Sequence, residues 1–300
     1  MIIKRIDNVE FKLKSDQDFL WIKKYGTVFN VIDETGSGCI CFGVMNNNKK
    51  YFLKIAGANT VEAEVHPEES ISVLKEAVKI YKILEHPNLI KLVEHYDYLN
   101  YYVAVFEWID GMCLFDHWNF KKYSETPQLI SPAKRFKELS IKKKLHVVDV
   151  MFSFLETVAN NNYVAVDFYD GSIMYDFDID RTTICDIDFF RKKPTINNLG
   201  TDFFGTKRLK APEEYIYGTC IDEVTNVFTL GAMIFDFFGK FDNREIEERY
   251  INNKFSPCDL SKWTLSEACY KIVLKAVSID RDKRFKTISE FYLEFNSALV

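Results

Sequence analysis

Three aspartates in the middle of the chain are the residues with the clearest capacity for chemistry. Asp167 follows one apolar, strand-like run, and Asp186 and Asp188 follow a second. Carboxylates at the ends of two strands can converge on one site, where one serves as a base and another holds Mg²⁺. The sequence therefore predicts an acidic site that binds magnesium.

Three further aspartates, at positions 176, 178 and 180, have the spacing that opens a calcium-binding loop. Such a loop needs glycine at its sharp turn and a bidentate glutamate at its end. Arg181 and Ile187 occupy those two positions. We therefore interpret the three aspartates as a solvated turn.

A lysine and two glycines nearer the N-terminus could bind an anion. Lys54 ends an otherwise apolar strand, and a buried ammonium needs an anionic partner, for which Glu76 on the following helix is the candidate. Gly36 and Gly38 lie between strand-like runs, where the missing Cβ would let backbone N–H groups approach phosphates. The alternatives are an outward-facing Lys54 and a plain β-turn at the glycines.

The elements that must position these residues change in type along the chain. Strand-like runs come first, at about 31–55, 89–96 and 101–108, with a helix predicted over 68–84. Because strands precede helices without regular alternation, the predicted fold class is α+β.

The second half is predicted to be mainly helical. The apolar spacing predicts helices around 145–158 and within 264–298, and 224–238 has the apolar character of a helix buried on every side. Residues 119–140 are polar and contain two prolines, which favours an exposed loop or insertion.

Composition excludes several classes of protein. The 300 residues are 47% hydrophobic and 15% aromatic, which favours a packed interior over disorder. A net charge of −5 without a basic cluster argues against nucleic-acid binding. The seven scattered cysteines argue against a zinc or disulfide framework, and no apolar run is long enough for a membrane span. We expect a soluble, cytoplasmic protein.

Three later segments together resemble the eukaryotic-type (Hanks-type) serine/threonine protein kinases. Residues 205–213, Gly-Thr-Lys-Arg-Leu-Lys-Ala-Pro-Glu, are similar to the Gly-Thr…Ala-Pro-Glu segment that closes the family's activation region. Residues 226–231 resemble the family's buried helix, with Asn226 where aspartate is usual. Arg284 lies in a segment resembling the late motif whose arginine pairs with the Ala-Pro-Glu glutamate, which implies a buried Glu213–Arg284 ion pair.

The resemblance covers about residues 30–295 and implies a protein-kinase-like, two-lobed fold. The expected single domain would have a small, β-rich N-lobe at about 1–106 and a larger helical C-lobe at 107–300.

The resemblance also implies roles for the site residues. Asp167 falls at the catalytic aspartate, and Thr206 at the threonine that marks kinases specific for serine and threonine. Asp188 falls at the metal-binding aspartate with Asp186 as its rival, and Ser172 takes the place of a metal-binding asparagine.

The same comparison implies an ATP site. Phe106 would be the gatekeeper of the adenine pocket. The residues expected to bind the nucleotide through its phosphates or adenine, or to support those that do, are Gly36, Ser37, Gly38, Lys54, Glu76, Glu107 and Ile109.

Several positions depart from the family pattern. Val166 stands where arginine is usual, Tyr169 where lysine is usual, and Phe52 where a small residue packs on adenine. Asp170 is an additional candidate metal ligand. The expected activity is transfer of the γ-phosphate of ATP, with Mg²⁺, to a serine or threonine of a protein substrate. A pseudokinase acting as a scaffold and a small-molecule kinase of the aminoglycoside or choline type are the alternatives.

Overall fold

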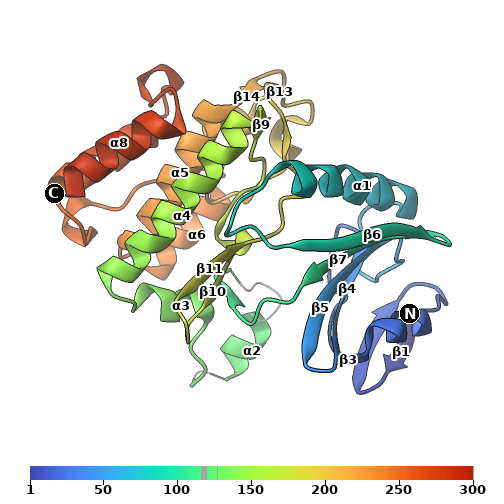
Figure 1. Cartoon of the computed structure of the whole chain (residues 1–300). Helices are drawn as coiled ribbons and strands as arrows, with labels where there is room; N and C mark the ends of the chain where they lie inside the picture. The colour runs from blue at the N-terminus through green and yellow to red at the C-terminus, as the bar shows by residue number, and fades with distance from the viewer. Residues whose placement is uncertain (116–119, 127, 300) are drawn as a thin grey trace. The chain divides into compact units, whose positions relative to one another are not determined.

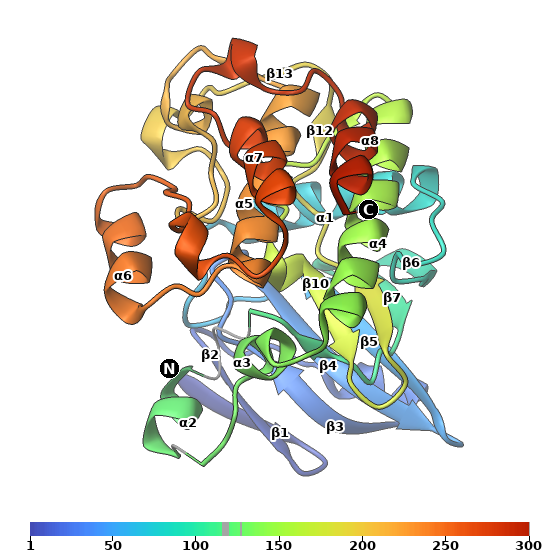
Figure 2. The same cartoon turned by 90° about the vertical axis from the view of Figure 1, so that its left-hand side faces the viewer.

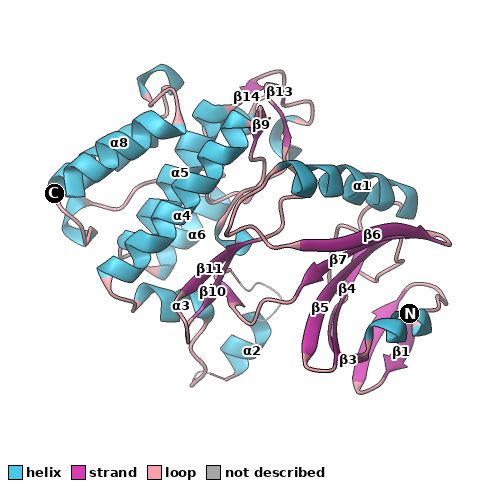
Figure 3. Ribbon diagram, in the orientation of Figure 1, coloured by secondary structure: helices cyan, strands magenta, loops and turns pink. Residues whose placement is uncertain are grey.

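The protein folds into two compact units. The computed structural model describes residues 1–115, 120–126 and 128–299. Unit 1 comprises Met1–Ile83 and Ile90–Asp110, and unit 2 comprises Leu84–Leu89 and Gly111–Val300. Unit 1 is mainly strand and unit 2 mainly helix (Figure 3). The predicted α+β class is confirmed, whereas the single domain with lobes at about 1–106 and 107–300 stays a prediction.

A five-stranded antiparallel sheet forms the centre of unit 1, in the order β3-β4-β5-β7-β6. Its strands are β3 (Thr27–Ile32), β4 (Cys39–Asn46), β5 (Lys49–Ala56), β6 (Leu92–Tyr98) and β7 (Tyr101–Glu107). The β4–β5 turn uses Asn47 at φ 48° and Asn48 at φ 65°, a conformation that asparagine tolerates better than most residues.

Helix α1 (Pro67–Ile83) packs along β5, β6 and β7 on one face of this sheet (Figure 1). Its buried side chains follow the spacing of one helix face, at Leu74, Ala77, Val78 and Tyr81. The helix predicted over 68–84 is therefore confirmed within a residue at each end.

The other face of the sheet is covered by the N-terminal segment, which the sequence patterns did not predict. Strands β1 (Ile2–Ile6) and β2 (Val9–Leu13) form a hairpin, and a 3₁₀ helix, η1 (Leu20–Tyr25), follows it. Phe11 and Phe19 from this segment are buried in one core with Phe42 of β4. Burial of these rings contributes strongly to the stability of unit 1.

Helices are the main secondary structure of unit 2. They are α2 (Phe120–Glu125), α3 (Pro132–Lys137), α4 (Ile141–Asn160), α5 (Glu223–Phe238), α6 (Asn243–Ile251), α7 (Glu267–Ala276) and α8 (Ile288–Leu299). Helix α5 is buried along nearly its whole length, as predicted for 224–238, and packs with α4, α7 and α8 (Figure 2). The predicted helical stretch 264–298 consists of α7 and α8, with the 3₁₀ helix η7 (Arg281–Lys283) between them.

Short strands connect these helices. They are β8 (Met112–Cys113), β9 (Tyr163–Val164), β10 (Ile173–Asp176), β11 (Arg181–Ile184), β12 (Arg191–Lys192), β13 (Thr195–Ile196) and β14 (Cys220–Ile221).

Strands β10 and β11 form a hairpin whose turn holds the three closely spaced aspartates. There the Asp176 carboxylate accepts the N–H groups of Asp178 (2.9 Å) and Ile179 (3.3 Å), which agrees with the interpretation as a turn.

For 119–140 we expected an exposed loop or insertion; residues 119 and 127 lie outside the described part. The stretch is largely exposed where its side chains are described, but much of it is helical and not an irregular loop. Helices α2 and α3 occupy this stretch. Ser131 caps α3 and Pro132 stands at its first turn, a favourable start for a helix. Phe136 is buried against Tyr175 and Phe237, with ring centroids 5.7 and 4.7 Å away. The sequence pattern did not predict α3, because a single buried ring, that of Phe136, holds this helix in place.

Within the described residues, none of the helices has the length and apolar character needed to cross a membrane.

Candidate active site

The segment that carries Asp167 is held in place by helix α5. Asp167 lies three residues after β9, at φ 57°. Two residues before it, the peptide groups of Ala165 bond to Asn226 of α5: the Ala165 N–H donates to Oδ1 and Nδ2 donates to the Ala165 carbonyl, both at 2.8 Å. Asn226 is buried. This pair of bonds fixes the backbone that leads into Asp167.

The β10–β11 hairpin places Ser172 beside Asp186. Ile173 and Ile184 are paired in register, and the N–H of Cys185 donates to the Ser172 carbonyl at 2.9 Å. Asp186 follows at φ 54° with an exposed side chain, whereas Asp188 is 6% exposed. The two aspartates therefore differ in access to solvent.

The carboxylates of Asp167 and Asp186 are electrostatic neighbours. Burial, and then the charge of Asp186, raise the pKa of Asp167 to about 7. Lys210, followed by hydrogen bonding from the Thr206 hydroxyl and backbone N–H, acts in the opposite direction and lowers that pKa. The structure thus brings together Asp167, Thr206 and Asp186, which were predicted as site residues, in unit 2.

This group of side chains fits a magnesium ion. Ser172 is fully buried, and its hydroxyl oxygen has no hydrogen-bond partner among the described residues. In the same part of the chain no three His, Cys, Asp or Glu side chains cluster as a metal site. Mg²⁺ typically takes one or two carboxylates and completes its shell with water and substrate phosphates. Asp186 with Ser172 and Asp188 nearby would suit such a site.

Asp170 is not available as the metal ligand that the sequence suggested. Its carboxylate forms a buried ion pair with Arg208, and Arg208 also pairs with Asp236 at 2.6 Å. Burial raises the pKa of Asp170, and the Arg208 charge opposes that shift. Asp170 therefore links the segment around Asp167 to the segment containing Arg208.

Tyr169 lies at the position where the resemblance to kinases leads us to expect a lysine. A Cβ added to Gly171 would lie 2.2 Å from the Tyr169 ring, so the ring lies directly on the glycine backbone. Burial, and then the charges of Asp186 and Asp167, raise the pKa of the Tyr169 hydroxyl. Tyr169 is therefore a neutral neighbour of the two carboxylates.

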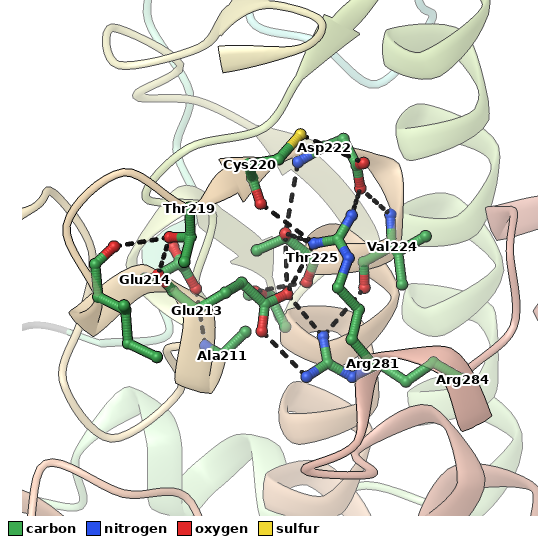
Figure 4. A network of polar contacts seen from close by, with 12 residues as sticks. Ala211, Glu213, Glu214, Thr219, Cys220, Asp222, Val224, Thr225, Arg281 and Arg284 are labelled. Atoms are coloured by element: carbon green, nitrogen blue, oxygen red, sulfur yellow. Dashed lines mark hydrogen bonds and ion pairs between the residues drawn. The ribbon is translucent and has the colours of Figure 1, made fainter. Parts of the chain in front are cut away.

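The predicted Glu213–Arg284 ion pair is confirmed (Figure 4). The two guanidinium nitrogens of Arg284 lie 2.7 and 3.0 Å from the Glu213 oxygens, and both residues are buried. Arg281 (3.2 Å) and the Thr225 hydroxyl (3.0 Å) also contact Glu213. This network joins η5 (Pro212–Tyr215) to the start of α5 and to the loop before α8.

Lys54 lies on the sheet face that α1 covers. It is paired in register with Ala104 of β7, two residues from Phe106, and Phe106 packs against Tyr81 of α1 at 4.9 Å. The predicted partner, Glu76, has a side chain that is 62% exposed and pairs with Lys79 at 2.5 Å. The prediction of a Lys54–Glu76 ion pair was therefore wrong, because Glu76 pairs with Lys79. The next residue, Ala77, is the one that α1 turns toward the sheet.

The glycine-containing loop connects β3 and β4 and packs on the segment before α1. The Gly36 carbonyl accepts the N–H of Glu64 at 2.9 Å. Gly38 has φ 69°, and a Cβ there would lie 3.2 Å from Ser70 and Val65 side-chain atoms. Glycine at 38 is thus required by backbone geometry and close packing. The roles of Gly36, Ser37 and Gly38 toward a nucleotide stay a prediction.

The expected adenine-binding segment ends β7. Phe106 is buried, and its ring lies 6.4 Å from that of Phe52, its register partner on β5. Glu107 uses its backbone N–H for the Lys91 carbonyl at 2.9 Å. The proposed contacts of Glu107 and Ile109 with adenine remain predictions.

Lys210, in the turn after Thr206, is a buried cation that sequence reasoning missed. It is 4% exposed, and its ammonium donates to the Phe203 carbonyl at 2.6 Å. Lysine is seldom buried, and the apolar neighbours Leu209 and Ala211 were the only local signal.

Comparison with known proteins gives a distant similarity to a kinase. No family model matches the chain. A curated protein described as serine/threonine-protein kinase 1, from African swine fever virus, is 22% identical over 211 residues, which cover 70% of this chain. The chain spans 63% of the length of that relative. This distant similarity points in the same direction as the motifs at 205–213 and 281–285.

Proposed function

We propose that this protein is an ATP-dependent kinase that transfers the γ-phosphate to serine or threonine hydroxyls of protein substrates. The observation that carries the proposal is the arrangement around Asp167. Asn226 fixes the backbone before it, and Thr206 and Asp186 act on the charge of its carboxylate. The similarity to a viral serine/threonine-protein kinase supports the same activity.

In this proposal Asp167 is the catalytic base. It orients the substrate hydroxyl and accepts its proton as the oxygen forms a bond to the γ-phosphorus and the bond to the β-phosphate oxygen breaks. Thr206 favours the charged form of this carboxylate, because it lowers the pKa of Asp167. Phosphoryl transfer depends mainly on positioning and electrostatics, so a few well-placed groups can support it.

Asp186 is the preferred metal-binding residue, because its side chain is exposed and adjacent to Asp167. Asp188 and Ser172 are the additional candidates. A bound Mg²⁺ would supply positive charge to the phosphates. Lys54 is proposed to neutralise the α- and β-phosphates, with Gly36, Ser37 and Gly38 covering them.

The test is phosphate incorporation by the Asp167→Ala variant. We expect a loss of about 10²–10⁴-fold, which is typical when a general base is removed. Asp178→Asn is the matched control, because Asp178 lies exposed in the β10–β11 turn and should leave the rate unchanged. Equal rates in the wild type and Asp167→Ala would refute the assignment.

A second candidate is a pseudokinase that binds a partner without turnover. The specific observation in its favour is the aromatic packing on the α1 side of the unit 1 sheet, where the Phe52 ring lies 6.4 Å from Phe106 and 6.5 Å from Trp108. Thermal unfolding with millimolar Mg-ATP separates the two candidates, because a ligand of the native state raises the melting temperature. An unchanged melting temperature would favour the pseudokinase.

A further inference from the structure

Four buried charges of alternating sign form a chain through unit 2. Arg249 and Arg208 each pair with Asp236 at 2.6 Å. Arg208 also pairs with Asp170. The four side chains are between 1% and 14% exposed. Buried charges are tolerated when each has an opposite neighbour, and removing one of them leaves another uncompensated. The members of this charge chain therefore depend on one another.

Arg208 is the member that bonds to two carboxylates at once. Its Nη1 donates to Asp236 at 2.6 Å, and its Nη2 donates to Asp170. Its guanidinium carbon lies 4.6 Å from the centroid of the Phe115 ring, a cation–π distance. A guanidinium offers N–H groups in fixed directions within one plane, whereas a lysine ammonium is a compact point charge. Arg208 therefore fixes the relative placement of the two carboxylates as well as compensating for their charge.

Asp170 lies in the tight turn that follows Asp167. It begins the 3₁₀ helix η3 (Asp170–Ser172), in which the Ser172 N–H donates to the Tyr169 carbonyl at 2.9 Å. Asp167 is three residues before Asp170, and Ser172 is two residues after it. Because so few bonds separate these residues, a displaced Asp170 would shift Asp167 or Ser172 with it. The bonds of Asn226 hold the backbone before Asp167, and the pair with Arg208 holds the backbone after it.

The other end of the charge chain is anchored in helix α6. Arg249 is 1% exposed, whereas the other described side chains of α6 are exposed or half-buried. Its guanidinium carbon lies 3.8 and 4.5 Å from the ring centroids of Phe241 and Phe255, and its Nη2 donates to the Ser256 carbonyl at 2.7 Å. Arg249 binds one carboxylate oxygen of Asp236 and Arg208 binds the other. Arg249 thus holds Asp236 in the orientation that Arg208 needs.

We propose that Arg208 is a positioning residue for the segment Asp167–Ser172, and that Asp236 and Arg249 support it. Its two bonds hold Asp170 in a fixed place relative to helix α5. A misplaced catalytic base lowers the rate of transfer more than the binding of ATP, so the effect belongs in kcat. This catalytic consequence rests on the proposed kinase function, whereas the coupling of the buried charges does not.

The coupling is tested first without any activity. We would measure the melting temperatures of Arg208→Met, Asp170→Asn and the double variant. Arg208→Met removes the cation between two buried carboxylates, and we expect it to lower the melting temperature by about 10 °C. In the double variant one of those carboxylates is replaced by a neutral amide, so the loss should be several degrees smaller than the sum of the single losses. Strictly additive losses would overturn the coupling, whether or not the protein is a kinase. If Arg208→Met does not fold, the same comparison is made with Arg208→Lys.

The positioning role is tested with Arg208→Lys, which keeps the charge and removes the planar pair of donors. We expect kcat for phosphate incorporation to fall by about 10–10²-fold, with a KM for ATP within threefold of the wild type. The assay is run where circular dichroism shows the variant fully folded, so that lost stability cannot account for a lower kcat. Arg249→Lys should lower kcat by a smaller factor, because it acts through Asp236. Arg244→Lys is the matched control and should behave as the wild type, since Arg244 is 86% exposed.

The two proposals fail in different ways. An inactive wild type with coupled melting temperatures would refute the kinase function alone and leave the charge chain supported. An active wild type in which folded Arg208→Lys keeps the full kcat would refute the positioning role of Arg208.

Discussion

At the scale of single residues, opposing effects act on a few buried charges of the candidate site. Burial and Asp186 raise the pKa of Asp167, whereas Lys210 and Thr206 lower it. Because these groups come from separate segments, the charge of Asp167 depends on the folded arrangement more than on its own sequence neighbours. The charge of Glu214 also depends on the folded arrangement, because burial raises its pKa.

Glu214 should make stability depend on pH. Burial raises its pKa in the folded protein to about 8 from the model-peptide value of 4.5. A carboxyl group whose folded pKa is raised binds its proton more tightly in the native state. The stability that Glu214 contributes to the folded protein is therefore fully present below the unfolded pKa. It is lost as the pH rises through the folded pKa. We expect the free energy of unfolding to fall by roughly 2–4 kcal/mol between pH 5 and 9, as measured by denaturant titration.

The Glu214→Gln variant checks this assignment. A glutamine oxygen can still accept the Ala211 N–H but cannot ionise, so the decrease in stability above neutral pH should be much smaller. Glu267→Gln is the control, because Glu267 is exposed and pairs with Lys271 at the surface. An equal pH dependence in the wild type and Glu214→Gln would rule Glu214 out as its source.

At the scale of elements, helix α5 organises the candidate site through two polar side chains. Asn226 in its first half holds the Ala165 peptide, and Asp236 in its second half pairs with Arg208 and Arg249, both at 2.6 Å. Arg208 in turn pairs with Asp170. One buried helix thus positions the chain on both sides of Asp167.

Asn226→Leu should disrupt the segment that leads into Asp167. The Ala165 N–H and carbonyl would remain buried without partners, and we expect a loss of about 2–4 kcal/mol in the free energy of unfolding. Asn226→Asp should be less damaging, because a carboxylate can still accept the Ala165 N–H. It repels the Ala165 carbonyl, so some loss of stability remains. Denaturant unfolding of the two variants tests this order. A leucine variant as stable as the wild type would show that the two bonds contribute little.

The Glu213–Arg284 pair connects elements far apart in the chain. Arg284→Met would leave the buried carboxylate of Glu213 with Arg281 as its remaining cation, and we expect a loss of about 3–5 kcal/mol. Lys286→Met is the control, since Lys286 is 54% exposed and its ion pair spans 3.8 Å. Thermal and denaturant unfolding should separate the two variants clearly. Similar losses in both would contradict a special role for the buried pair.

At the scale of the whole molecule, each of the two units has extensive buried structure of its own. In unit 1 the N-terminal segment is part of the core and not an appendage, because Phe11 contacts Phe19 and Phe42 at centroid distances of 5.8 and 5.3 Å. Residues before about position 30, where the family resemblance begins, therefore contribute to the stability of unit 1.

Phe11→Ala tests this contribution. Removing a buried aromatic ring leaves a cavity and should cost about 3–5 kcal/mol in the free energy of unfolding. Leu20→Ala is the control, since Leu20 is 61% exposed and such substitutions change stability by no more than about 0.5 kcal/mol. If Phe11→Ala behaves like Leu20→Ala under denaturant titration, the N-terminal hairpin is dispensable.

Much of the local structure followed from sequence patterns. The positions of α1, α4 and α5 were predicted because a buried helix face imposes a regular apolar spacing. The Glu213–Arg284 pair was predicted from its resemblance to known motifs, and the structure confirms it. Asp167 and Asp186 were expected to meet because each ends a strand.

Other features escaped prediction because they depend on which face of an element turns inward or on distant segments. Helix α1 points Ala77 toward the sheet and Glu76 outward, a difference of one residue that periodicity did not resolve. Arg208 and Lys210 have the ordinary appearance of surface residues until folding brings carboxylates next to them.

The order of residues along the chain was sufficient to determine the α+β class, the main helices and the acidic character of the candidate site, because periodic burial and motif spacing are local properties. Tertiary structure alone decided which charges are neighbours: Arg208 with Asp170, and Glu76 with Lys79 in place of Lys54. The physical reason is that a charge pair depends on distance in space and on burial, and neither can be read from separation along the sequence.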